Sequence, residues 1–123
     1  MRSASAAASD VYEGQLLYDG WLYYLRHYQG VLSRVNAKAG DEPSGPFRLG
    51  SVFNIYSSPV AAAGRIYVTD RNGKTLVISN ATEPTALALN ELDDLFSASA
   101  ALVGDAIFLR GEQSLYCIPH KKN

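Results

Sequence analysis

A motif that occurs three times constrains the fold of this chain more than any other feature. Each copy contains a short apolar strand, a two-residue turn and a second strand rich in aliphatic and aromatic residues. Leu22, Ile66 and Ile107 occupy the same position in the three second strands, and they are 44 and then 41 residues apart. A period of about 40–45 residues with several short strands per unit is typical of propeller blades. The sequence therefore predicts an all-β fold made of successive blades.

The strands of each repeat follow from alternating apolar residues between turn signals. The first strands are expected at Gln15–Tyr18, Val60–Ala63 and Ala100–Val103. The turns are expected at Asp19-Gly20, Ala63-Gly64 and Gly104-Asp105, where Gly and Asp tolerate positive φ. The second strands are expected at Trp21–Leu25, Arg65–Thr69 and Ala106–Leu109, and the third at Val31–Val35, Thr75–Ser79 and Leu115–Ile118.

A fourth strand completes a blade in two of the repeats. We expect it at Phe47–Ser51 and at Thr85–Leu89, where alternation favours a strand over the helix that propensity alone allows. The third repeat has no fourth strand before Asn123. The predicted organisation is a flexible tail or swapped edge strand over residues 1–10 and one β-propeller repeat domain over 11–123, with blades at about 11–51, 55–92 and 96–118.

The charge pattern argues against two classes of partner. The chain has 11 basic and 12 acidic residues, which are interspersed and give a net charge of −1. No basic stripe suggests nucleic acid, and no apolar stretch approaches the roughly 18 residues that span a bilayer. The N-terminal Ala/Ser segment lacks the apolar core of a secretory signal. We therefore expect a soluble chain, and its compartment stays open.

Two single residues are assigned structural roles. Cys117 is the sole cysteine and lies in the apolar run Leu115-Tyr116-Cys117-Ile118, so it is expected to be a small buried side chain rather than a reactive thiol. Trp21 follows a hairpin glycine, and we interpret it as a strand residue that packs in the core or between blades.

The repeat resembles that of the PQQ-like β-propellers, the blade unit of the quinoprotein dehydrogenases. The residues that carry the likeness are Ser58–Ala61 with Arg65–Val68, the turn Val35–Gly40, and Phe108–Ile118, which is similar to a C-terminal repeat. The resemblance implies a propeller fold, and relatives are often periplasmic or secreted. Relatives that hold the quinone have a tryptophan after the turn, whereas Asp41-Glu42-Pro43 follows it here. No cofactor is therefore expected.

No group of residues in the sequence predicts catalysis. His27 and His120 are too far apart in the sequence to suggest a metal site, and Asp93-Asp94 is interpreted as a solvated loop pair. No Gly-x-Ser-x-Gly elbow or phosphate-binding loop occurs. The favoured hypothesis is a non-catalytic module for protein interaction or assembly. The alternative is a remnant or subunit of a quinoprotein-type enzyme whose active residues are absent here.

One predicted surface suits recognition of another protein. In a propeller, the hairpins between second and third strands emerge on the same face as the connections between blades. The candidate interaction residues on that face are Arg26, His27, Tyr28, Tyr56, Asp70, Arg71, Phe96 and Arg110, accompanied by Asn54, Asn72, Asp93, Asp94 and Glu112. Arginine and aromatic side chains are enriched at protein interfaces. The alternative is that these are ordinary polar hairpin tips.

Self-association is also predicted, most simply as a homodimer that closes a six-bladed ring. Closed propellers have about 4–8 blades, so three blades leave two faces bare, and Val60–Ala63, Ile66 and Val68 are candidates to line them. The third blade would end in an unpaired edge at Leu115–Ile118. The segment Ser5–Val11 of the other copy is the candidate to pair with this edge.

Overall fold

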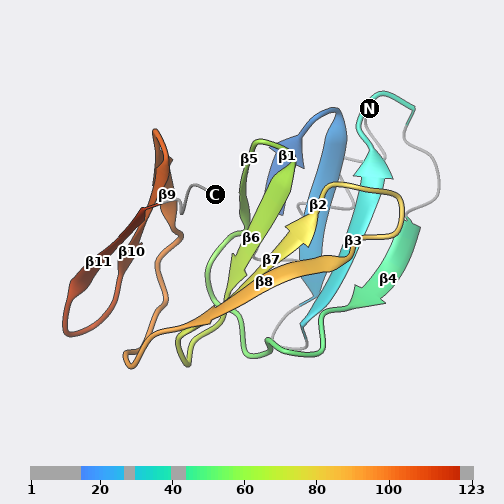
Figure 1. Cartoon of the computed structure of the whole chain (residues 1–123). Helices are drawn as coiled ribbons and strands as arrows, with labels where there is room; N and C mark the ends of the chain where they lie inside the picture. The colour runs from blue at the N-terminus through green and yellow to red at the C-terminus, as the bar shows by residue number, and fades with distance from the viewer. Residues whose placement is uncertain (1–14, 27–29, 40–43, 120–123) are drawn as a thin grey trace.

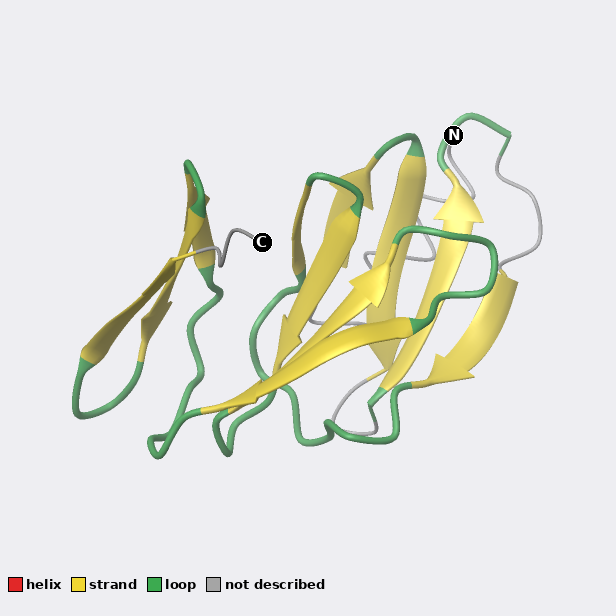
Figure 2. Cartoon of the chain, in the orientation of Figure 1, coloured by secondary structure: helices red, strands yellow, loops and turns green. Residues whose placement is uncertain are grey.

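Three antiparallel β-sheets make up the described part of the chain, and they follow one another in sequence order. The structure is a computed structural model, and it describes residues 15–26, 30–39 and 44–119. Figure 1 shows the three sheets side by side, and Figure 2 shows strands and loops without any helix among these residues. The all-β prediction is confirmed, and each sheet corresponds to one sequence repeat.

Each sheet is a meander in which consecutive strands pair. Blade 1 contains β1 (Gln15–Tyr18), β2 (Trp21–Arg26), β3 (Val31–Asn36) and β4 (Ser44–Arg48). Blade 2 contains β5 (Val60–Ala62), β6 (Arg65–Thr69), β7 (Lys74–Ser79) and β8 (Ala86–Glu91). Blade 3 contains β9 (Ala101–Val103), β10 (Ala106–Arg110) and β11 (Leu115–Pro119). The first strands β1, β5 and β9 lie next to one another, so the blades share an inner edge.

Every blade has two faces, and strand alternation assigns each residue to one of them. We call the face directed toward the following repeat the forward face and the opposite one the backward face. The central residue of the second strand marks the forward face and is aromatic in all three blades: Tyr23, Tyr67 and Phe108. Its neighbour in sequence, Leu22, Ile66 or Ile107, marks the backward face. Period-two alternation therefore divides the residues of each strand between the two faces of its blade.

The hydrophobic core lies between blades rather than inside one of them. One cluster joins the forward face of blade 1, with Tyr23 and Leu32, to the backward face of blade 2, with Ile66 and Val68. A second joins blade 2 to blade 3 through residues that include Tyr67, Ile107, Leu109 and Phe96. Ile66 and Val68 are fully buried. The prediction that these two residues line a bare face is wrong, because blade 1 already covers them.

The junction between blades 1 and 2 also contains a polar cluster. The Tyr23 hydroxyl donates to Oδ1 of Asn80, and Arg34 Nη1 donates to the Tyr23 hydroxyl at 3.2 Å. The Arg34 guanidinium is buried and stacks 3.8 Å from the centre of the Trp21 ring. Burial raises the pKa of the Tyr23 hydroxyl, although hydrogen bonding and charge from Arg34 oppose this. Trp21 thus packs at a blade junction, as the sequence predicts.

The predicted fourth strands are wrong in position for blade 1 and confirmed for blade 2. The fourth strand of blade 1 is Ser44–Arg48 rather than Phe47–Ser51, because Gly50 adopts a φ of 72° and the chain turns away. Leu49 N–H instead bonds to the Gly30 carbonyl at 2.8 Å. The fourth strand of blade 2 is a strand as predicted, at Ala86–Glu91. In the described residues blade 3 has three strands, so β11 is an edge strand, as expected.

Candidate functional site

One end of the blade stack carries the predicted interaction residues, and we call it the loop face. It consists of the β6–β7 hairpin (70–73), the β10–β11 hairpin (111–114) and the connections 49–59 and 92–100, which lie along the lower edge in Figure 1. The tight β1–β2, β5–β6 and β9–β10 turns lie at the opposite end of the stack. The loop face thus combines segments from successive repeats.

Each interblade connection is fixed to the hairpin of the blade that follows it. Arg71 N–H bonds to the Asn54 carbonyl at 3.1 Å, and Glu112 N–H bonds to the Leu95 carbonyl at 3.0 Å. Donor and acceptor both recur 41 residues later, so this is one contact made twice by the repeat. Phe96 N–H additionally bonds to the Arg71 carbonyl at 2.9 Å. These backbone bonds give the loop face a defined shape.

A buried carboxylate organises each of the two described hairpins. Asp70 Oδ1 accepts the backbone N–H groups of Asn72 at 2.9 Å and Lys74 at 3.0 Å, closing the β6–β7 hairpin on itself. In blade 3 the corresponding position is Gly111, and the carboxylate comes from Asp94 in the preceding connection. Asp94 accepts the N–H groups of Gln113 and Ser114 and the hydroxyl of Tyr116.

Hydrogen bonding keeps the Asp94 carboxylate ionised despite its environment. Burial raises the pKa of Asp94, but donors from Leu95, Gln113, Tyr116 and Ser114 outweigh it, so this pKa lies below its usual value. The pKa of Tyr116, which donates to this carboxylate, shifts in the opposite direction. Burial and the hydrogen bond to Asp94 raise the pKa of the Tyr116 hydroxyl. A carboxylate with this many donors holds structure and is poorly placed to accept a proton in catalysis.

Arg71 connects the hairpins of blades 2 and 3 at the surface. Its Nη2 lies 2.6 Å from Oε2 of Glu112, and its Nη1 donates to the Ser97 hydroxyl at 2.5 Å. The guanidinium carbon lies 5.9 Å from the centre of the Tyr56 ring, within cation–π range. Arg71 is partly exposed, so this side chain is held in one place while it presents charge to solvent.

The two connections of the loop face also expose apolar side chains, one of which, Tyr56, lies beside this arginine. Phe53 is 54% exposed, Tyr56 is 43% exposed and Leu95 is 40% exposed. Phe53 and Tyr56 come from the connection before blade 2, and Leu95 from the connection before blade 3. Neighbours in sequence such as Val52, Ile55 and Phe96 are buried. The connections therefore place one set of apolar residues in the core and another set in solvent.

The structure keeps some of the predicted interaction residues at the surface and removes others. Tyr56, Arg71 and Arg110 remain accessible to a partner. The prediction is wrong for Asp70, Asp94 and Phe96, which are buried. The two carboxylates bind backbone N–H groups of the hairpins, and Phe96 fills the junction with blade 3. His27 and Tyr28 lie outside the described residues, and Arg26 is described only as the last residue of β2.

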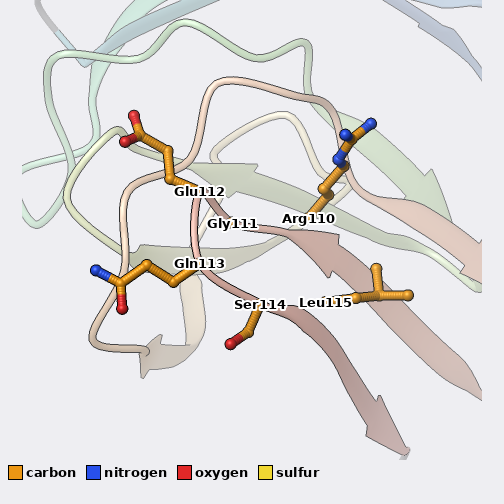
Figure 3. A pocket seen from close by; sticks show the side chains of 6 residues that line it. All are labelled: Arg110, Gly111, Glu112, Gln113, Ser114 and Leu115. Carbon is orange, nitrogen blue, oxygen red and sulfur yellow. The ribbon is translucent and has the colours of Figure 1, made fainter.

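A shallow hollow follows the β10–β11 hairpin. It is lined by Arg110, Gly111, Glu112, Gln113, Ser114 and Leu115, and it is open to solvent. Figure 3 shows that Arg110 and Leu115 extend to one side of the hairpin, away from Gln113 and Ser114. Ligand pockets usually enclose most of their ligand, so this open surface suits contact with a macromolecule better than capture of a small molecule.

Sequence reasoning missed Phe53 and Leu95 on this face. The available signal was an apolar residue inside each polar connection, at neighbouring repeat positions. It also assigned Cys117 to the core, and this is wrong, because Cys117 is exposed on the forward face of blade 3, which no described segment covers.

The described residues contain neither a metal-binding cluster nor a membrane-spanning helix. No group of three or more His, Cys, Asp or Glu side chains in residues 15–26, 30–39 and 44–119 is arranged to hold a metal ion. Within the same residues, no helix has the length and apolar character needed to cross a membrane.

Comparison with solved structures gives the fold. BamB from Moraxella catarrhalis superimposes with a TM-score of 0.53 and 10% sequence identity, over 89% of this chain and 44% of the BamB chain. The chain therefore spans less than half the length of this structural neighbour. No protein-family model matches the sequence, and no curated protein matches it either. At this identity the likeness shows the fold alone, which is a run of β-propeller blades.

Proposed function

We propose that this chain is a non-catalytic β-propeller module that binds another protein through its loop face. One observation carries the proposal. Phe53, Tyr56 and Leu95 are exposed on the loop face, Tyr56 lies beside Arg71, and repeated hydrogen bonds fix the backbone of this surface. Aromatic and arginine side chains dominate the energetics of protein interfaces, and a preorganised surface lowers the entropy lost on binding.

The chemistry of the face indicates the kind of partner. Arg71 already has one carboxylate, Glu112, whose side chain is largely exposed. A protein segment that offers an apolar side chain and a carboxylate fits this surface, because the carboxylate can share the guanidinium donors while the apolar group packs on Phe53 or Tyr56.

Site-directed photo-crosslinking tests the proposal. A benzophenone amino acid at Phe53 or Tyr56 is expected to capture a specific protein in extract of the source cells. The matched control places the same probe at Leu87 on β8, which is 51% exposed and lies away from the loop face. Capture at Phe53 and Tyr56 but not at Leu87, and its loss in a Leu95→Ser/Arg71→Ala background, supports the proposal. Equal capture at all three positions contradicts it.

The enzymatic alternative has its own readout. A quinoprotein-type subunit binds a quinone cofactor together with calcium, and the resemblance implies that this chain lacks the tryptophan for such a site. Titration of the purified chain with pyrroloquinoline quinone and Ca²⁺ is expected to leave cofactor absorbance and fluorescence unchanged. Saturable binding would replace the interaction module by the enzyme subunit as the better hypothesis.

Self-association is the second part of the proposal. The forward face of blade 3 is open, and β11 is an edge strand among the described residues. Both features favour a homodimer. Sedimentation equilibrium measures it directly, and a well-folded species of 13.3 kDa at every concentration would contradict it. The predicted six-bladed ring further needs the backward face of blade 1 to be available to the other copy.

A further inference from the structure

The two outer faces of the three described blades differ in accessibility. On the backward face of blade 1, Tyr24 is 6% exposed and Val35 is 4% exposed. On the forward face of blade 3, Val103 is 61% exposed, Leu115 is 70% exposed, and Cys117 is exposed as well. Leu17, on β1 of the backward face of blade 1, is 66% exposed, but the centre of that face at Tyr24 and Val35 is buried. A head-to-tail contact would need the centres of both faces to be open, whereas among the described residues the blade 3 face is the more open of the two.

The open face continues an interface that the chain makes twice. Phe108 takes the place of Tyr23 and Tyr67, whose forward faces pack on the next blade. Around Phe108, strand pairing places Ala101 and Cys117 directly beside it. This surface has the apolar pattern of a blade interface, so its natural occupant is another sheet that presents apolar side chains.

We propose that this occupant is the same blade 3 face of a second copy, so that the homodimer is two-fold symmetric with blade 3 against blade 3. The blade 3 face is the more open of the two outer faces, and two copies cover it on both sides when it pairs with itself in a two-fold dimer, the commonest symmetry of homo-oligomers. This inference deepens the proposed self-association and replaces its ring geometry.

Charge selects one of the two possible two-fold axes. Arg110 lies at one end of β10, and Asp105 lies in the turn at its other end. An axis parallel to the strands places Arg110 against Arg110 of the other copy. An axis perpendicular to the strands runs the two β10 strands antiparallel and places Arg110 near Asp105 of the other copy. The second arrangement pairs opposite charges and avoids repulsion, so the dimer adopts it.

The same axis sets the position of the cysteines. Cys117 pairs with Phe108 in the middle row of the face, so a perpendicular axis through that row brings the two Cys117 residues opposite each other. A parallel axis instead places Cys117 opposite Ala101 of the other copy. Packed sheets lie about 10 Å apart, beyond the roughly 7 Å between Cα atoms that a disulfide tolerates. A short bismaleimide is therefore the suitable reagent.

The size of the face predicts a weak dimer. Three strands spaced about 4.8 Å apart, with about 3.3 Å per residue, give a face of roughly 14 Å by 17 Å. A standard stable interface buries about 800 Å² on each partner, which is more than this face provides. Dissociation is expected in the micromolar range or weaker, so the measurement must extend to concentrated protein.

Sedimentation equilibrium and crosslinking of the full chain test the proposal together. The wild type is expected to dimerise with concentration and to crosslink through Cys117 with the bismaleimide. Val103→Lys and Leu115→Lys are both expected to remain folded and monomeric, since both side chains are exposed. Leu87→Lys on β8 is the matched control and leaves both readouts unchanged.

Charge reversal tests the axis. Arg110→Asp is expected to weaken the dimer roughly fivefold, because it turns two weak attractions into repulsions. Adding Asp105→Arg to this variant restores the affinity. A dimer that Val103→Lys leaves intact, a dimer that does not crosslink, absence of rescue, or a monomer at all concentrations each overturns the inference. Val103→Lys keeps the loop face, so protein capture at Phe53 remains a separate measurement of the proposed function.

Discussion

Gly111 lies directly beneath the carboxylate of Asp94, and a Cβ on Gly111 would fall 2.2 Å from Oδ2 of that side chain. The two residues belong to different segments, since Asp94 precedes blade 3 and Gly111 begins the β10–β11 hairpin. The Asp94 carboxylate occupies the space that a side chain on the hairpin would need. Recognition of this hairpin by Asp94 therefore depends on glycine at position 111.

Gly111→Ala is expected to lower the free energy of unfolding by about 1–3 kcal/mol, because the added methyl group displaces the Asp94 carboxylate from its donors. Thermal and urea denaturation measure the loss. In an Asp94→Ala background the same substitution should have little effect, since no carboxylate remains to be displaced. Equal losses in the two backgrounds would show that the contact is not the cause.

Stability is expected to depend on pH through Asp94. The pKa of this group is lower in the folded chain than in the unfolded chain, so the unfolded state binds the proton more readily. The contribution of Asp94 is thus complete above the unfolded value of about 3.9 and is lost as the pH falls through the folded value. Asp94→Asn should lower the melting temperature at neutral pH, and its difference from wild type should shrink below about pH 4. A constant difference across this range would contradict the assignment.

Gly73 and Gly64 both have positive φ, but only Gly73 is close to another backbone segment, so substitutions at the two positions should differ in their cost to stability. At Gly73 φ is 103°, and a Cβ would lie 1.9 Å from the Leu92 carbonyl oxygen, so Gly73→Ala should cost at least about 2 kcal/mol. At Gly64 φ is 76° with open space around it, so Gly64→Val adds backbone strain alone and should cost about 1–2 kcal/mol. Chemical denaturation ranks the two. The reverse order would show that the β6–β7 hairpin can move away from Leu92.

Removing the polar group of Tyr23 is expected to lower the free energy of unfolding more than removing that of Arg34. Tyr23→Phe removes the hydroxyl that joins Arg34 to Asn80 and should cost about 1–3 kcal/mol. Arg34→Met keeps an apolar stem beside Trp21 and removes a buried cation whose Nε has no hydrogen-bond partner among the described atoms. It should change stability by no more than about 1 kcal/mol. A larger loss in Arg34→Met than in Tyr23→Phe would contradict this order.

The strands were predictable because their signals are local. The turns Asp19-Gly20 and Ala63-Gly64 have positive φ at both residues, as the sequence indicates, and the strands beside them begin where alternation begins. The position of β4 was not predictable, since Leu49 leaves the sheet to bond with Gly30, a contact between distant residues. The order of the blades follows from the repeat.

The candidate site was predictable only in part. The location of the loop face follows from the repeat, whereas the burial of each side chain depends on which connection covers it. Asp70 is polar and lies in a hairpin, yet its carboxylate is turned inward to bind Asn72 and Lys74. Phe53 is apolar, yet it is exposed. Neither outcome can be read from polarity, because both depend on tertiary contacts.

The polar junction between blades 1 and 2 limits how such a chain can be rearranged in evolution. The position opposite the central aromatic residue is Arg34 in blade 1, Val77 in blade 2 and Cys117 in blade 3. The hydrogen bond that the Tyr23 hydroxyl donates is accepted by the side-chain carbonyl of Asn80, which follows β7 of blade 2. A gene that lost or shuffled a repeat would preserve the shape of every blade but bring together faces that no longer match. The blades are duplicates in outline, and each has become specific to its neighbour.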